Sequence, residues 1–248
     1  MVDQSFLRRP RLYVDSLTRY GGGPRGPVPP LRTDDAAAGP RPAPLGGLPK
    51  RVLDLVGASI MLVLLAPMML IVALLVRIIV GRQVIFRQER VGFDGVPFVC
   101  FKFRSMVPDA DAVLRRHLAS NPAAAEEWSE TQKLKDDPRV GPLGRALRKT
   151  SIDELPQLFN VLRGDMSLVG PRPVLPDELT TRYGRYAPAY LRARPGLTGM
   201  WQANGRSSVG YRGRIARDRY YVKHWSLGLD LRLLLKTIPA LLNFGQTA

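Results

Sequence analysis

A run of 22 residues without a charged side chain, from Leu55 to Val76, constrains this chain more than any other feature of its sequence. A helix of this length rises about 33 Å at about 1.5 Å per residue, enough to cross the hydrocarbon core of a bilayer. Soluble proteins seldom bury an uncharged helix this long. The run therefore predicts a segment that enters a membrane rather than a core helix.

Pro67 and the basic flanks indicate how the segment enters the membrane. Inside a helix, proline removes one backbone hydrogen bond and crowds the preceding turn, so we expect a kink or break near Pro67. Lys and Arg favour the cytoplasmic side of a membrane. They flank the apolar run on both sides, at Lys50, Arg51, Arg77, Arg82, Arg87 and Arg90. Both ends are therefore expected on the cytoplasmic side, which favours a re-entrant helix-break-helix over residues 49–82. A straight membrane span is the alternative.

Two charged residues stand at the start of the expected helix. Asp54 follows Arg51 by three residues, a spacing that lets the two side chains pair, and Asp54 also faces the positive end of the helix dipole. An ordinary N-terminal helix charge explains Asp54 equally well. We assign Arg51, Asp54 and Pro67 to the predicted membrane hairpin.

The segments on either side of the hairpin differ in composition. The first fifty residues contain nine Pro and seven Gly without sustained apolar periodicity, so residues 1–48 are predicted to be a disordered tail. The pair Arg8-Arg9 is not followed by an apolar stretch before Leu45, so no secretory signal is expected. Residues 83–248 are predicted to form a cytosolic domain.

The cytosolic part contains both strand and helix signals. Residues 84–87 and 98–103 are typical of short strands, and residues 109–120 and 143–149 of helices bounded by prolines. The expected fold class is α/β, mostly helical with a small strand content.

Two further helices are expected towards the C-terminus. An apolar stripe predicts a packed amphipathic helix that ends at Gly164. Its members are Leu155, Leu158, Phe159 and Leu162. Residues 227–242 are mostly apolar with interspersed charges, which fits either a core helix or one that lies at the bilayer interface.

The charge balance requires an anionic partner. The chain has 37 basic and 21 acidic side chains, a net charge of +16, which suits nucleic acid, a phosphate-rich substrate or an anionic membrane leaflet. Cys100 is the only cysteine, and His117 and His224 show no zinc-ligand spacing. A reducing, cytosolic environment is favoured.

Adjacent carboxylates at Asp153 and Glu154 precede the amphipathic helix. One interpretation is a capping box formed by Ser151 and Glu154. Pro156 would then fall inside the second turn, where proline is disfavoured, so the carboxylates more naturally precede the helix and point into a site. A helix N-terminus attracts anions, and carboxylates can hold a divalent cation against phosphate. The local pattern supports capping and function about equally.

Basic residues are spread around this carboxylate pair in the sequence. Most isolated basic side chains are solvated surface charges. Arg172 differs, because a rigid Gly-Pro-Arg-Pro loop holds its backbone and its guanidinium suits a phosphate. The candidate cations are Lys102, Arg148, Arg172 and Arg194.

Several long motifs occur together and in one order. They are Lys50-Arg51-Val52-Leu53-Asp54, Arg87-Gln88-Glu89-Arg90-Val91-Gly92, Phe101-Lys102-Phe103-Arg104-Ser105-Met106, Ile152-Asp153-Glu154-Leu155-Pro156-Gln157-Leu158, Gly164-Asp165-Met166-Ser167-Leu168-Val169-Gly170-Pro171-Arg172-Pro173 and Arg194-Pro195-Gly196-Leu197-Thr198-Gly199. With the membrane run broken at Pro67, they closely resemble the monotopic phosphoglycosyl transferases, the bacterial sugar transferase family, over residues 50 to about 242.

This resemblance implies a reaction and a location. Members transfer a sugar 1-phosphate from a UDP-sugar to polyprenyl (undecaprenyl) phosphate, release UMP, and so initiate exopolysaccharide or another cell-surface glycan. The expected location is the bacterial inner membrane, with the catalytic domain on its cytoplasmic face and amphipathic helices at the interface. By the same resemblance, Asp153 is the nucleophile that takes the phosphosugar covalently, and Glu154, with Asp153, holds Mg²⁺. The phosphate-binding cations implied are Lys102, Arg148 and Arg172, to which we add Arg194.

Two segments bear on the substrate. Residues 200–207 and 220–226 look like the branch that transfers a hexose 1-phosphate, glucose or galactose. Transfer of an N-acetylamino-sugar phosphate is the alternative within the family. A non-enzymatic, membrane-anchored polyanion-binding protein is the alternative outside it, and would make Asp153 and Glu154 dispensable. No nucleic-acid partner is expected, and the sequence leaves open whether the chain forms a homodimer.

Overall fold

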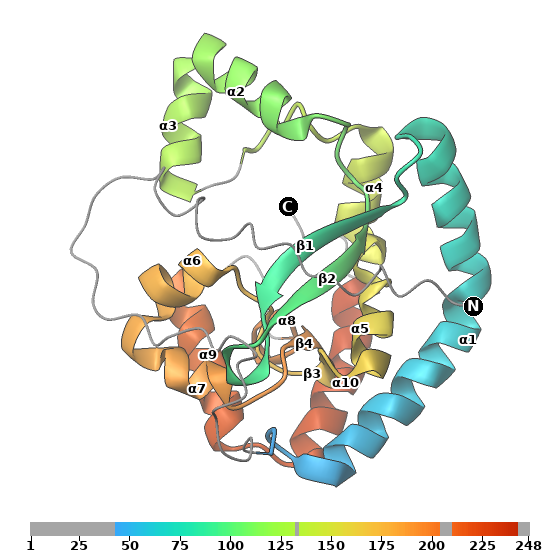
Figure 1. Cartoon of the computed structure of the whole chain (residues 1–248), viewed down its shortest axis with the longest axis vertical. Coiled ribbons are helices and arrows are strands. Elements are labelled where there is room, and N and C mark those ends of the chain that lie inside the picture. The colour runs from blue at the N-terminus through green and yellow to red at the C-terminus, as the bar shows by residue number, and fades with distance from the viewer. Residues whose placement is uncertain (1–42, 132–133, 204–209, 243–248) are drawn as a thin grey trace, which may run out of the picture.

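The computed structural model describes residues 43–131, 134–203 and 210–242 (Figure 1). Most of the predicted disordered tail and residues 204–207 of the hexose-branch motif lie outside the described residues. The end of the predicted tail is described. There the backbone N–H of Leu45 donates to the Arg192 carbonyl at 3.0 Å, and the first helix begins at Gly47.

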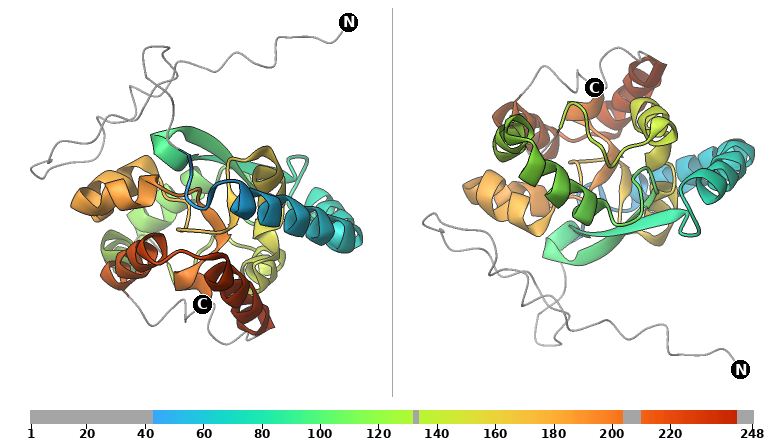
Figure 2. Two further views of the ribbon diagram at one scale, coloured as in Figure 1. Left: turned by 90° about the horizontal axis from the view of Figure 1, so that it is seen from below. Right: turned by 90° about the horizontal axis from the view of Figure 1, so that it is seen from above.

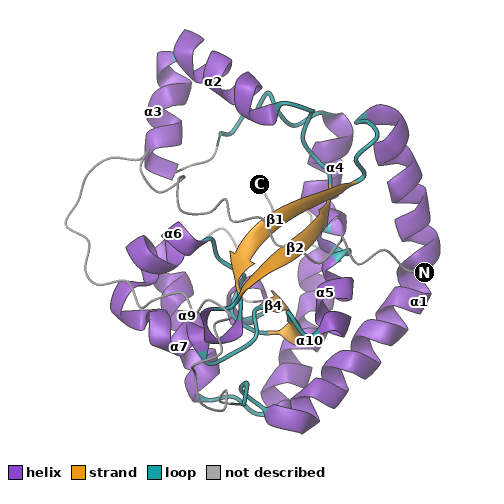
Figure 3. Cartoon of the chain, in the orientation of Figure 1, coloured by secondary structure: helices purple, strands orange, loops and turns teal. Residues whose placement is uncertain are grey.

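The described chain is mostly helical with a small strand content, as the sequence predicts, and its strands form two small pairs (Figure 3). The α-helices are α1 (Gly47–Ile79), α2 (Ala110–Ser120), α3 (Pro122–Thr131), α4 (Pro142–Thr150), α5 (Gln157–Arg163), α6 (Pro176–Glu178), α7 (Ala187–Leu191), α8 (Met200–Ala203), α9 (Tyr211–Lys223) and α10 (Leu227–Leu242). The strands are β1 (Ile85–Val91), β2 (Pro97–Phe103), β3 (Ser167–Val169) and β4 (Gly196–Thr198). Short 3-10 or π turns occupy Phe93–Gly95, Ile152–Glu154, Leu179–Tyr183 and Gly184–Tyr186.

Helix α1 carries the apolar run without a break. It is long and apolar enough to cross a membrane, with a mean hydropathy of 2.8 in its most apolar window, of which only 11% is buried. Of the kink or break expected near Pro67, the break is wrong, because one helix continues from Gly47 to Ile79 and bends along its length (Figure 1). Proline deprives the helix of a single N–H, so the chain can bend there and remain helical on both sides.

One face of α1 packs against the rest of the chain over both halves of the helix. Ala58, in the first half, is fully buried in the cluster that contains Leu158 and Val161 of α5. Val76, in the second half, is fully buried in the cluster that contains Phe103 of β2. The opposite face is exposed and apolar. Its exposed large side chains include Val52, Val56, Ile60, Val63, Leu64, Ile71, Leu74 and Ile78.

Arg51 and Asp54 bind different partners, so the predicted pair between them is wrong. The Arg51 guanidinium donates to the carbonyls of Val161 and Leu162 at 2.6 and 2.7 Å. These carbonyls belong to the last turn of α5, where few helical donors remain, and the Val161 carbonyl also accepts a hydrogen bond from the Gly164 N–H at 3.1 Å. Asp54 Oδ1 accepts hydrogen bonds from Ser167 Oγ at 2.8 Å and from the Leu168 N–H at 2.9 Å. Both charges therefore fasten α1 to the domain.

The predicted strands and the amphipathic helix largely match the structure. β1 and β2 form an antiparallel hairpin in which Ile85 lies opposite Phe103, and β1 extends beyond its predicted end at Arg87. In α5, Leu158 is fully buried, but Phe159 is 48% exposed, so the predicted packed stripe is wrong at that residue. The helix begins after Pro156, which shifts its buried face towards Val161 and Asn160.

The parallel pair β3 and β4 is not predicted from the sequence. Each strand has three residues, and Ser167 lies opposite Gly196. A side chain on Gly196 would collide with the backbone of Gly170, and one on Gly170 with the Arg194 carbonyl. Glycine therefore permits a close approach between β4 and the loop that follows β3.

Helix α10 has the bounds predicted for it. One face is buried like a core helix, and the other face is exposed and apolar, as expected for a helix at a bilayer interface. Leu233 and Asp230 are buried, whereas Leu231 and Leu235 are 50% and 68% exposed. Lys50 Nζ of α1 lies 2.7 Å from Asp230 Oδ2 in a buried ion pair. This ion pair joins the first turn of α1 to α10. Figures 1 and 2 show the two helices.

Candidate active site

The turn that carries Asp153 and Glu154 precedes α5 rather than opening it. The 3-10 turn Ile152–Glu154 comes first, and α5 begins at Gln157 with Pro156 as its N-cap. Proline is accepted at this edge because the first N–H groups of a helix have no helical partner. No side-chain hydrogen bond from Ser151 caps the turn. The interpretation that the carboxylates precede the helix is confirmed, and the capping box is not formed.

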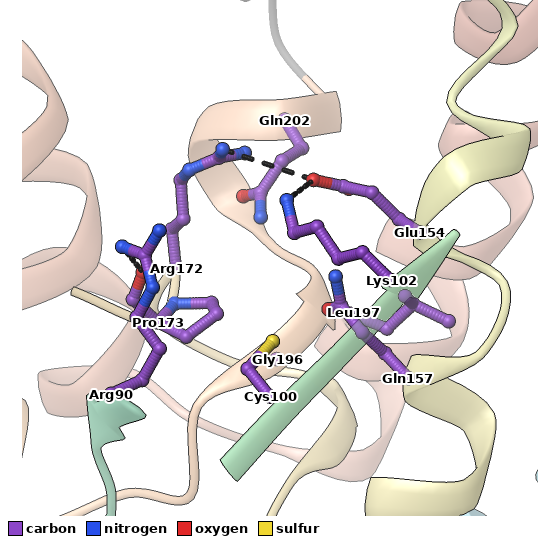
Figure 4. A pocket seen from close by; sticks show the side chains of 10 residues that line it. All are labelled: Arg90, Cys100, Lys102, Glu154, Gln157, Arg172, Pro173, Gly196, Leu197 and Gln202. Carbon is purple, nitrogen blue, oxygen red and sulfur yellow. Dashed lines mark hydrogen bonds and ion pairs between the residues drawn. The ribbon is translucent and has the colours of Figure 1, made fainter. Parts of the chain in front are cut away.

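A strand and a loop each place one cationic side chain beside Glu154. Lys102 of β2 lies with its Nζ 2.7 Å from Glu154 Oε1. Arg172, in the loop after β3, lies with Nη2 3.8 Å from the same oxygen. The glycine contact between β3 and β4 fixes the position of this loop, and the guanidinium also lies 5.6 Å from the centre of the Trp201 ring. Two predicted phosphate-binding cations therefore meet the predicted metal ligand (Figure 4).

Asp153 is buried beside this group and has a free carboxylate. It is 8% exposed and accepts no hydrogen bond from any residue that the structure describes. Burial, and then repulsion from Glu154, raises the pKa of Asp153 to about 6. The positive charges of Lys102, Arg148 and Arg172 oppose this rise. At neutral pH the Asp153 carboxylate is therefore mostly ionised.

Arg148 approaches Asp153 from another side. It lies in the last turn of α4, and its Nε donates to Ser105 Oγ at 2.9 Å. It does not line the pocket around Glu154, but its charge acts on Asp153. Three of the four predicted cations thus surround the carboxylate pair.

Arg194 lies elsewhere. Its Nε donates to the Gly164 carbonyl at 2.9 Å, just beyond the end of α5, and its charge interacts with Arg51 and Asp54. It is not among the residues that line the pocket. Terminal helix carbonyls attract basic side chains, so Arg194 serves the same end of α5 as Arg51, and we leave it out of the proposed phosphate site.

The pocket also contains residues that sequence reasoning missed (Figure 4). Arg90 of β1 donates to the Pro173 carbonyl at 3.3 Å, and the sequence offers it only as a basic flank of the membrane run. Its place in a motif with Glu89 and Gly92 is the signal that could have assigned it to the site. The lining residues are Arg90, Cys100, Lys102, Glu154, Gln157, Arg172, Pro173, Gly196, Leu197 and Gln202. The pocket is lined by three cationic side chains and one carboxylate, so its excess of positive charge suits an anion.

The carboxylate pair fits the chemistry of magnesium. No cluster of three or more His, Cys, Asp or Glu side chains occurs in the part of the chain that the structure describes. Magnesium, however, commonly binds through one or two carboxylates together with substrate phosphates. Asp153 has an unpartnered carboxylate and Glu154 lines the anion pocket, so the two could hold such an ion once a phosphate is bound.

Comparison with known proteins identifies the family. Residues 46–244 match the family described as bacterial sugar transferase. The chain belongs to this family. It is therefore an enzyme, a phosphoglycosyl transferase, as its motifs predict.

Three relatives illustrate the breadth of this transferase family. The exopolysaccharide production protein ExoY of Sinorhizobium fredii is 51% identical over 197 residues, which cover 79% of this chain and 87% of the relative. The undecaprenyl-phosphate galactose phosphotransferase of Salmonella typhimurium is 48% identical over 194 residues, covering 78% of this chain and 40% of the relative. The UDP-glucose:undecaprenyl-phosphate glucose-1-phosphate transferase of Caulobacter vibrioides is 43% identical over 213 residues, covering 83% and 74%.

Proposed function

We propose that this enzyme transfers a hexose 1-phosphate from a UDP-hexose to polyprenyl phosphate through a covalent intermediate on Asp153. The observation that carries the proposal is the buried Asp153 carboxylate, which has no hydrogen-bond partner among the described residues and lies within the influence of three cations. A nucleophile needs an available lone pair, and a phosphoryl acceptor site needs positive charge around it. The names of the relatives from Salmonella and Caulobacter support this class of donor and acceptor.

The proposed reaction has two steps. In the first, an Asp153 oxygen attacks the phosphorus that carries the sugar, the bond from this phosphorus to the UMP oxygen breaks, and UMP leaves with the electron pair. In the second, an oxygen of polyprenyl phosphate attacks the same phosphorus, and the Asp153 carboxylate leaves. Lys102 and Arg172 would bind the phosphate oxygens, while Arg148 keeps Asp153 ionised.

Glu154 has a separate role in this proposal. Its bond to Lys102 holds both side chains at the pocket until the donor arrives. Magnesium, when held by Glu154 and Asp153, would neutralise charge on the donor diphosphate. The phosphate would then compete with Glu154 for Lys102 and Arg172.

The proposed location is the cytoplasmic face of the bacterial inner membrane. The exposed apolar face of α1 and the exposed leucines of α10 would enter the lipid, and the polyprenyl phosphate head would meet the site at the interface. We retain the re-entrant path for α1, as one bent helix with both ends on the same side.

Isotope exchange tests the first step. Purified enzyme with magnesium and UDP-glucose or UDP-galactose, without polyprenyl phosphate, should exchange labelled UMP into the UDP-sugar. The quenched enzyme should carry a hexose-phosphate adduct on the peptide that contains Asp153. Asp153→Asn should lose both signals, because an amide of the same size is a poor nucleophile.

Excess chelator should stop the exchange, magnesium should restore it, and Glu154→Gln should lose most of it while remaining folded. Exposed Asp177→Asn is the matched control and should exchange at the wild-type rate. Turnover by the wild type without exchange or adduct would remove the covalent role of Asp153. If labelled UMP exchanges only into UDP-N-acetylamino sugars, the alternative substrate class is favoured.

A further inference from the structure

Two glutamine amides in the pocket have no hydrogen-bond partner among the residues that the structure describes. Gln157, the first residue of α5, is 2% exposed, and Gln202 of α8 is 3% exposed. Both line the pocket with Lys102, Glu154 and Arg172. No hydrogen bond joins either side-chain amide to another described residue, and Gln202 Oε1 is itself fully buried without a partner. Figure 4 shows the Gln157 amide directed towards Lys102 and the Gln202 amide directed into the space between Arg172 and Lys102.

The buried, unpartnered Gln202 Oε1 points to a ligand, and the Gln157 amide lines the same pocket. A buried polar group that makes no hydrogen bond costs free energy, and almost all such groups in folded proteins are paired. Here both amides face the same small space. The cost is offset if a bound molecule supplies the partners when the site is filled.

The chemistry of an amide selects the kind of partner. Phosphate oxygens of the donor diphosphate only accept hydrogen bonds, so they suit the cations of the pocket and cannot satisfy Gln202 Oε1. An amide oxygen requires an O–H or N–H donor, and the adjacent N–H₂ group requires an acceptor. A hydroxyl group meets both needs. The amides therefore fit a neutral, hydroxyl-rich group that lies directly beside a phosphate.

We propose that Gln157 and Gln202 hydrogen bond hydroxyl groups of the donor sugar. The inference rests on the proposed function, since the hexose 1-phosphate is the hydroxyl-rich part of the donor whose phosphate the cations would bind. Both residues are well placed for this. Gln157 follows Asp153 by four residues, and Gln202 follows Trp201, whose ring contacts the Arg172 guanidinium.

The test replaces each amide by methionine, which is unbranched and of similar length. Gln202→Met and Gln157→Met remove no hydrogen bond within the described protein, so thermal stability should be unchanged or higher. Binding of UDP-glucose or UDP-galactose, measured by calorimetry in detergent, should weaken about 5- to 50-fold relative to UDP, because a neutral hydrogen bond to each hydroxyl is lost. Affinity for UDP itself should stay within about twofold of the wild type, a change too small to represent a lost hydrogen bond.

The ratio of UDP-sugar affinity to UDP affinity shows whether the amides contact the sugar or the nucleoside of the donor. If both affinities weaken together, the amides contact the ribose or uracil and the sugar assignment is overturned. If neither affinity changes in either variant, the proposal is overturned outright. Deoxy-hexose donors provide the second arm: the donor that lacks the contacted hydroxyl should bind wild type and variant alike.

Tyr211→Phe is the matched control. Tyr211 Oη is also buried without a partner, but Tyr211 does not line the pocket, so the variant should keep the wild-type affinity ratio. Binding is measured in an Asp153→Asn background, in which the proposed first step cannot occur, so this test remains informative if exchange on Asp153 fails. Failure of the amide proposal leaves exchange on Asp153 intact.

Discussion

At the scale of single residues, Asp218 of α9 is the clearest case of a charge held in an unfavourable place. The Tyr183 hydroxyl donates to Asp218 Oδ2 at 2.6 Å, while Oδ1 is buried without a partner among the described residues. Burial raises the pKa of Asp218 to about 6, although its bond to Tyr183 and the charges of Arg214 and Arg172 oppose the rise. The folded protein therefore keeps a proton that the unfolded chain loses near the ordinary value of 3.8.

This difference predicts a pH-dependent stability. Because the pKa is raised on folding, the favourable contribution of protonated Asp218 is complete below pH 4 and is lost as the pH rises through about 6. Asp218→Asn, which stays neutral and can accept the Tyr183 hydrogen bond, should gain stability over the wild type by about 1 to 3 kcal/mol between pH 4 and pH 7. Chemical unfolding in detergent at several pH values measures the difference.

Exposed Asp177→Asn is the control, and its stability relative to the wild type should not change with pH. A constant difference between Asp218→Asn and the wild type from pH 4 to pH 7 would show that Asp218 has an ordinary pKa.

Site residues could be predicted from the sequence where a short local pattern marks them. Asp153 and Glu154 stand out as an adjacent pair before a helix, and Arg172 as a cation in a rigid loop. Arg90, Gln157 and Gln202 did not stand out, because their shared feature is a pocket assembled by the β1–β2 register and the close approach of β3 to β4. Neutral amides also give no charge signal in a sequence.

At the scale of elements, the buried ion pair between α1 and α10 is expected to contribute to the free energy of unfolding. Lys50 and Asp230 side chains are 3% and 0% exposed, and Asp230 also accepts hydrogen bonds from Tyr221 Oη and Trp225 Nε1. Lys50→Met would leave a buried carboxylate without its cation, although two neutral donors remain. We expect a loss of about 2 to 4 kcal/mol in the free energy of unfolding.

Denaturant unfolding of Lys50→Met and of the exposed control Lys223→Met measures this loss. Lys223→Met should lie within about 0.5 kcal/mol of the wild type, because surface charges contribute little. Equal stability of the two variants would mean that the neutral donors alone support Asp230.

Long, strongly patterned elements could be predicted and short ones could not. The apolar run, the hairpin strands and α10 each carry a pattern of their own over many residues. The three-residue strands β3 and β4 have no room for a pattern, and they exist because glycines let two distant backbones meet. The helical continuity of α1 through Pro67 was also not predictable, because a helix can either bend or break at an internal proline.

At the scale of the whole molecule, the chain limits how α1 can lie in a membrane. The N-terminal end of α1 is tied to the domain by Lys50 and Asp230. Its C-terminal end at Ile79 is followed closely by β1, which starts at Ile85 and pairs with β2 of the same domain. The few residues between them reach about 17 to 20 Å when extended, whereas a bilayer core is about 30 Å thick. The connection is too short to cross a bilayer.

Cysteine labelling tests this topology. In a background where buried Cys100 is replaced by Ser, single cysteines at exposed positions Leu48 and Gln83 should both resist a membrane-impermeant maleimide in intact cells. Both should react after the membrane is permeabilised, which serves as the control for reactivity. Labelling of only one of the two positions in intact cells would establish a span. A span would place Lys50 and Arg51 on the opposite side from Asp230 and α5, so the same result would be incompatible with the contacts that join the start of α1 to the domain.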